Sequence, residues 1–155
     1  MWGVTPMAML APFDEFHEII GLTAVLVTIA CAVVFGTRPY RLAGFVIAID
    51  AFGWLAIHWL FDQYDRVLFS HAKSVLILAL LAVIVLRFPG RGLVSLLCLQ
   101  LLAVLIHISV WVDRSIRSDV NGLILNVIGW GMLAVLVAGS LQRFGRELTI
   151  DATRP

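Results

Sequence analysis

Five ionisable side chains lie inside long apolar stretches of the sequence, where a charge needs a reason to be present. They are Asp50, His58, His71, Lys73 and His107. An ionisable group at the centre of a membrane helix costs at least about 2.5 to 3.5 kcal/mol, so it needs a partner, a hydrated cavity or a route to the interface. Carboxylates and histidines can exchange protons, histidines can ligate metals, and a carboxylate can pair with a lysine.

The composition indicates that a membrane surrounds these side chains. The chain of 155 residues is 61% hydrophobic and 14% charged, and its mean hydropathy is +1.01. Soluble domains carry about 25% charged residues. The net charge of +1 offers no basic surface for nucleic acid, so we expect no nucleic-acid partner and a lipid bilayer as the surroundings.

The apolar residues fall into blocks that are long enough for membrane helices of about 17 to 25 residues. They predict an all-α, polytopic membrane protein with about five transmembrane helices in a single membrane domain over residues 1–155. Charged or Pro- and Gly-containing segments (TRPY, DQYDR, FPGRG, DRSIRSD) separate the blocks. The expected spans lie near residues 17–36, 42–61, 67–88, 93–112 and 121–141, and residues 142–155 form a short cytoplasmic tail.

Arginines predict the orientation, because cytoplasmic loops are enriched in basic residues. Seven arginines would lie on the side of the C-terminus and three on the other, which places the N-terminus outside and the C-terminus in the cytoplasm. The ten arginines against one lysine are typical of a GC-rich genome. We therefore expect a multi-pass protein of the bacterial inner (plasma) membrane.

Depth and helical phase predict a polar pocket in the outer half of the bundle. At about 1.5 Å per residue, four spans place polar groups roughly 5 to 9 Å below the outer boundary, and two spans place one about 17 Å down. Asp50, Trp54 and His58 form one stripe on a helix, and Gln100 and His107 form another. The candidate ligand- or proton-binding residues are Asp50, Lys73, His58, His107, Gln100 and Asn126.

Asp50 and Lys73 leave alternatives open. A carboxyl group near mid-membrane is protonated, faces a hydrated cavity, or pairs with a cation such as Lys73. Lys73 itself either extends to the interface along its aliphatic chain or is the counter-ion of Asp50. His71 and Lys73 are two residues apart, so they cannot both face one pocket squarely.

The histidines allow a metal or haem site. His58, His71 and His107 are the candidate metal ligands, since two histidines on facing helices at one depth can hold a haem iron. The sequence contains no CxxCH or HExxH motif. The prediction of a haem or metal cofactor therefore depends only on the matching depths of these histidines.

Several functions fit these features. We expect a small integral membrane protein that is an accessory subunit of a larger membrane complex, with other membrane subunits or a second copy as partners. The alternatives are proton-coupled, ion or small-ligand transport through Asp50, a haem- or metal-binding anchor, and a holin-like lesion-forming protein. Short loops leave no room for a soluble catalytic domain, and the sequence favours a non-enzymatic role.

Overall fold

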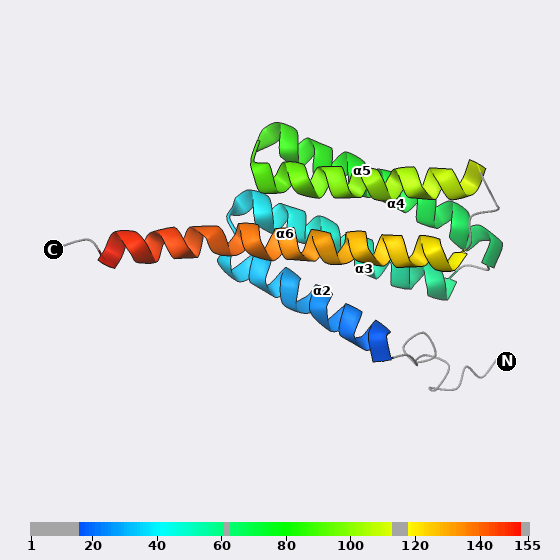
Figure 1. The fold of residues 1–155 in the computed structure, drawn as a ribbon, viewed down its shortest axis with the longest axis horizontal. Helices are drawn as coiled ribbons and strands as arrows, with labels where there is room; N and C mark the ends of the chain where they lie inside the picture. The colour runs from blue at the N-terminus through cyan, green and yellow to red at the C-terminus, as the bar shows by residue number, and fades with distance from the viewer. Residues whose placement is uncertain (1–15, 61–62, 113–117, 153–155) are drawn as a thin grey trace.

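The protein is a bundle of long helices (Figure 1). The computed structural model describes residues 16–60, 63–112 and 118–152, and within these ranges it contains helices and no strand. The helices are α2 (Phe16–Phe35), α3 (Arg38–Leu60), α4 (Gln63–Arg87), α5 (Arg91–Val112) and α6 (Ser118–Ala152). The prediction of an all-α fold with five long helices is confirmed.

Local sequence explains the tight turn between α2 and α3. The Gly36 amide donates to the Ala32 carbonyl at 3.0 Å, so α2 closes at this glycine. Thr37 accepts a hydrogen bond from the Arg41 amide at 2.9 Å and thereby opens α3, with Pro39 in the first turn, where its missing N–H costs nothing. The segment TRPY thus ends one helix and begins the next, four residues earlier than the expected span.

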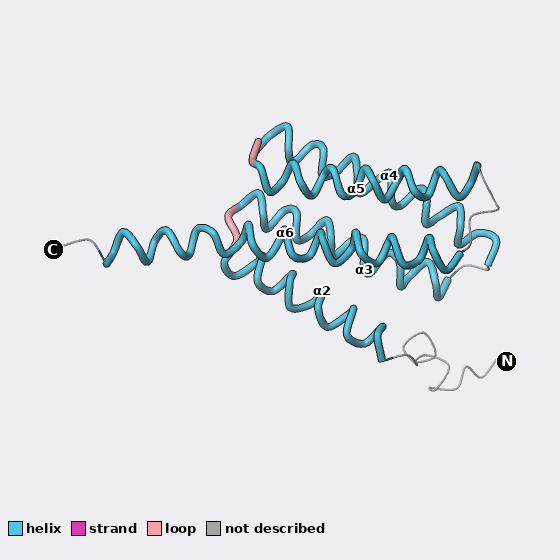
Figure 2. The backbone as a smooth tube through the Cα atoms, in the orientation of Figure 1, coloured by secondary structure: helices cyan, strands magenta, loops and turns pink. Residues whose placement is uncertain are grey.

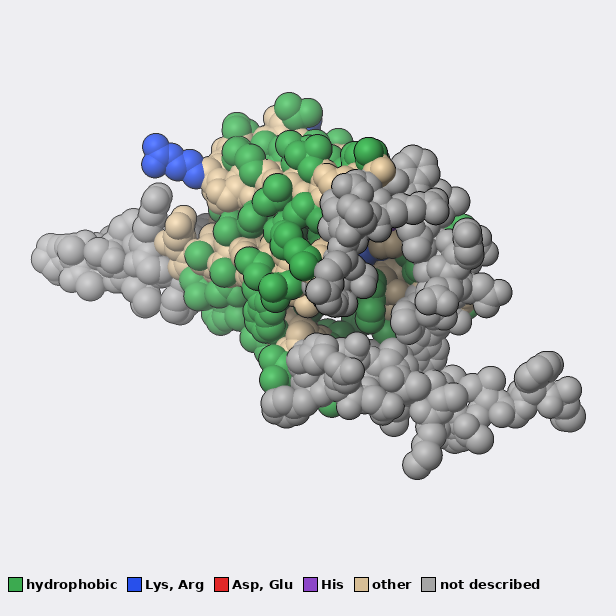
Figure 3. All heavy atoms as spheres, turned by 45° about the vertical axis from the view of Figure 1, so that its right-hand side comes forward, with side chains coloured by type: hydrophobic (Ala, Val, Ile, Leu, Met, Phe, Trp, Pro, Cys, Tyr) green, Lys and Arg blue, Asp and Glu red, His purple; other side chains and the backbone are tan. Residues whose placement is uncertain are grey.

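Within the part of the chain that the structure describes, four helices are long and apolar enough to cross a membrane. Their membrane-compatible parts are Arg38–Ile57, Phe69–Arg87, Arg91–Ser109 and Val120–Gln142. The described apolar part of α2, Ile19–Phe35, is shorter, at 17 residues. In the view of Figure 3 the described side chains around the bundle are almost all hydrophobic, as a lipid-facing surface requires.

Helix α6 continues past its apolar part. Its 35 residues correspond to about 52 Å, whereas the hydrocarbon core of a bilayer is about 30 Å thick. The helix therefore extends beyond the other four at the C-terminal end of the chain (Figure 1). The expected tail is largely helical, since α6 reaches Ala152.

The helices form a ring in which chain neighbours are also neighbours in space. Each helix packs against the next one along the chain, and α6 returns to pack against α2. The two loops that the structure describes, after α2 and after α4, are short and lie at the end of the bundle from which α6 projects (Figure 2). The start of α2 lies at the opposite end, which we call the α2-start end (Figure 1).

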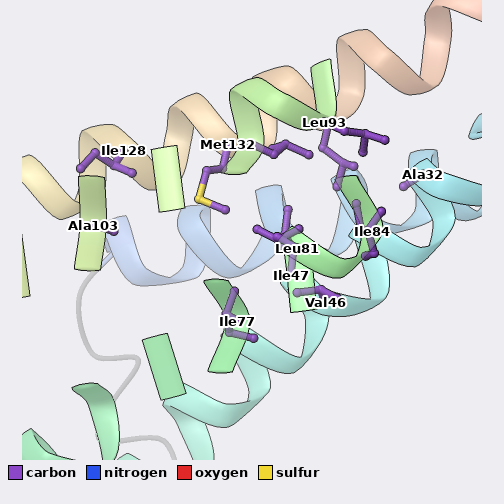
Figure 4. Close-up of a cluster of buried hydrophobic side chains, with 13 residues drawn as sticks. Ala32, Val46, Ile47, Ile77, Leu81, Ile84, Leu93, Ala103, Ile128 and Met132 are labelled. Carbon is purple, nitrogen blue, oxygen red and sulfur yellow. The ribbon is translucent and has the colours of Figure 1, made fainter. Parts of the chain in front are cut away.

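The buried core fills the half of the bundle away from the α2-start end. Fully buried side chains include Ile77 and Leu81 of α4, Leu96 of α5 and Leu136 of α6. Figure 4 shows Leu81 and Ile47 close together, with Met132 pointing toward the same cluster. Apolar contact of this kind holds the helices together where lipid supplies no hydrophobic driving force.

Tyr40 fills the space between three helices in this packed half. A Cβ placed on Gly92 would lie 2.3 Å from the Tyr40 hydroxyl oxygen, and a Cβ on Gly139 would lie 2.1 Å from Cε1 of the Tyr40 ring. Gly92 of α5 and Gly139 of α6 therefore leave the space that the Tyr40 ring occupies.

Candidate functional site

A cavity of about 680 Å³ opens in the half of the bundle nearer the α2-start end. Side chains from all five helices line it, including Val25 of α2, Asp50 of α3, Lys73 of α4, Gln100 of α5 and Asn126 of α6. This volume lies within the range of about 300 to 1,000 Å³ that is usual for small-molecule sites. The cavity is mostly apolar with a few polar groups, which is also the usual composition of such sites.

An ion pair forms part of the cavity wall. The Lys73 ammonium donates a hydrogen bond to Oδ1 of Asp50, and a second one of 2.9 Å to the Asp50 backbone carbonyl. The Lys73 side chain is 14% exposed and that of Asp50 is 36% exposed. The carboxylate therefore faces the open cavity, while the ammonium is more enclosed.

Gly53 sets the path of the lysine. A Cβ on Gly53 would lie 3.1 Å from Cδ of Lys73, so the aliphatic chain crosses α3 at the position where the side chain is absent. Gly53 lies one turn nearer to the α2-start end than Asp50 does, and Lys73 therefore extends deeper into the bundle. Lys73 was expected either to extend to the interface or to pair with Asp50, and in the structure it pairs with Asp50.

A hydrogen-bonded group lies beside this pair. Gln100 is 3% exposed, and its side-chain amide donates a hydrogen bond of 3.1 Å to the Ser74 carbonyl, which connects α5 to α4. The Ser74 hydroxyl donates to the Ser70 carbonyl at 3.0 Å. Serine hydroxyls commonly bond in this way to their own helix. These contacts fix the inner wall of the cavity.

The two histidines on α4 and α5 contact each other. Their ring centroids are 4.9 Å apart, and His71 Nε2 lies 3.2 Å from the His107 carbonyl oxygen. His107 also lies within electrostatic reach of Asp50 and Lys73. Because Nε2 of His71 faces a backbone carbonyl rather than the other ring nitrogen, this arrangement does not present two ring nitrogens to one iron.

The cavity brings together five of the six predicted binding residues. Lys73 lines it and His71 does not, as expected for residues two positions apart. The sixth candidate, His58, belongs to α3, but its side chain lies outside the described residues. Among the side chains that the structure describes, no three of the metal-ligating types come together, so a metal or haem site stays a prediction.

Sequence reasoning missed three contributors to the site. Gly53 was overlooked, although its position three residues after Asp50 could have suggested it. Ser70 and Ser74 were not among the candidate residues, yet both line the cavity, and the Ser74 backbone carbonyl accepts the hydrogen bond from Gln100.

Comparison of the chain with protein-family models, with curated proteins and with solved structures gave no match.

Proposed function

We propose that this protein is an integral membrane protein that binds a small ligand inside its helix bundle, with Asp50 and Lys73 as the charged groups of the site. One observation supports this above all others: the ion pair borders an open cavity and is not fully covered by other side chains. A pair that only joins two helices needs no open space beside it, whereas a ligand-binding pair does. Here the Asp50 carboxylate stays accessible from the cavity.

The cavity also has the chemistry of a binding site. Apolar side chains supply most of its surface, and Lys73, Asp50, His107 and Asn126 supply charge and hydrogen bonds. A ligand that enters can exchange hydrogen bonds with the pair, because each partner keeps further donor or acceptor capacity. Transport of the ligand through Asp50, and a place beside larger membrane subunits, remain predictions from the sequence.

Glycines on α6 offer a way to test the site without touching its charges. Gly129 lines the cavity, and a Cβ placed on it meets nothing within 4 Å. We expect Gly129→Leu to fill the cavity and to leave the helix intact, since leucine favours helix more than glycine does. Ala138→Leu, on the exposed face of the same helix, adds a similar bulk outside the cavity.

The measurement is native mass spectrometry of the protein released from its host membrane in mild detergent. We expect a retained small molecule in the wild type and in Ala138→Leu, and its loss in Gly129→Leu. No retained molecule in the wild type, or equal retention in Gly129→Leu, would overturn the proposed function.

A further inference from the structure

The cavity reaches the outside of the bundle sideways, at the level of the lipid. Asp50 and Phe52 both line it, yet residues two positions apart point roughly 200° apart around a helix. The cavity therefore contacts α3 over a wide part of its circumference, from Asp50 to the exposed Phe52. Phe52 is 51% exposed, and Trp130 of α6, which also lines the cavity, is 49% exposed.

Helix α2 lies beside this opening. In the ring, α2 packs between α3 and α6, the helices that carry Phe52 and Trp130. Ile20 of α2 lines the cavity and is 43% exposed, and a Cβ on the adjacent Gly21 meets nothing within 4 Å. The residues that surround the opening thus lie on both sides of α2 and are mostly apolar.

The two charges lie at the same level of the bundle. Lys73 is ten residues after the start of α4 at Gln63, and Asp50 is ten residues before the end of α3 at Leu60. At 1.5 Å per residue both positions lie about 15 Å from these helix ends. A lipid head that enters beside α2 therefore reaches both charges at one depth.

The charges themselves select the head. Asp50 and Lys73 together are neutral, so a ligand that carries an ammonium and an anion can pair with both and leave no charge alone. A purely anionic head that pairs with Lys73 would leave Asp50 without its partner and next to a second negative charge, and the two negative charges would repel each other.

We propose that the cavity binds a zwitterionic membrane amphiphile, whose ammonium contacts Asp50 and whose phosphate contacts Lys73, while its chains leave the bundle beside α2. This inference rests on the proposed function and names the class of ligand for the same site.

The test uses lipids that differ in one charge at a time. The full-length protein is reconstituted in nanodiscs with equal amounts of phosphatidylethanolamine, phosphatidylglycerol and diacylglycerol, and the lipid that stays bound after detergent extraction is counted by native mass spectrometry. We expect one phosphatidylethanolamine per protein, retained about tenfold over phosphatidylglycerol, which corresponds to about 1.4 kcal/mol. Soluble phosphoethanolamine, which has the same head without chains, should not displace it at equal concentration.

The variants separate the two charges. Asp50→Asn should remove the preference between the two phospholipids, and Lys73→Met should bring both down to the level of diacylglycerol. Gly129→Leu, in which the pair is intact, should lose the bound lipid, whereas Ala138→Leu should keep it.

Two results overturn the inference in different ways. Preferential retention of phosphatidylglycerol, or displacement by phosphoethanolamine, refutes a zwitterionic amphiphile and leaves the proposed function standing. If no lipid is retained here and the protein from its host membrane also carries no molecule, both proposals fail together.

Discussion

The ion pair between Asp50 and Lys73 makes a quantitative prediction about stability. Two unit charges about 4 Å apart interact by about 4 kcal/mol at an effective dielectric constant near 20. The Asp50 side chain is 36% exposed to the cavity, so solvent weakens this attraction, and we expect a coupling free energy of about 2 kcal/mol. Lys73→Met and Asp50→Asn each remove the charge of one partner and keep a side chain of similar size and shape.

A double-mutant cycle measures this coupling. The free energy of unfolding is obtained by titrating the micelle-bound protein with a denaturing detergent, for the wild type, both single variants and the double variant. Each single change should cost about 2 to 3 kcal/mol, and the second change should cost far less once the first has been made. Ser95→Ala, which loses only a bond within an exposed turn of α5, is the control. Additivity within about 0.5 kcal/mol would refute the pairing.

Two glycines give further predictions. Gly139→Ala should destabilise the protein by about 3 kcal/mol, because its Cβ would lie 2.1 Å from the Tyr40 ring, whose hydroxyl also lies against Gly92. In Gly131→Ala the new Cβ would lie 3.5 Å from Leu99, an ordinary contact, so this change should cost nothing. Equal unfolding free energies for these two variants would contradict the packing around Tyr40. Gly53→Leu should obstruct the lysine chain and destabilise as much as Lys73→Met, and the two changes together should cost little more than one. A fully additive double variant would show that Lys73 does not cross α3 at Gly53.

The sequence predicts the fold well because each helix carries its own signal. An apolar block of sufficient length must be a helix in lipid, and segments such as TRPY contain the residues that end one helix and begin another. The boundaries are less exact. Helix α4 begins at Gln63, four residues before the expected span, because polar residues continue a helix beyond the membrane boundary when nothing in the sequence stops it.

The candidate site was harder to predict because it depends on which helices are neighbours. Asp50, Gln100 and Asn126 all line the cavity, but the pocket expected from the sequence did not include α2, whereas α2 also lines it. The spacing of polar residues along one helix does not reveal which other helices are its neighbours in the bundle. Nor does it reveal that Gly53 leaves room for Lys73, since that depends on the approach of two helices.

The ionisation of Asp50 is the measurement that tests the central claim most directly. Infrared difference spectra between the wild type and Asp50→Asn, recorded in nanodiscs at neutral pH, isolate the carboxyl band of this residue. The pairing predicts an ionised carboxylate in the wild type and a protonated carboxyl in Lys73→Met, where the counter-ion is gone. A protonated carboxyl in the wild type, unchanged in Lys73→Met, would contradict a charged ligand site built on this pair.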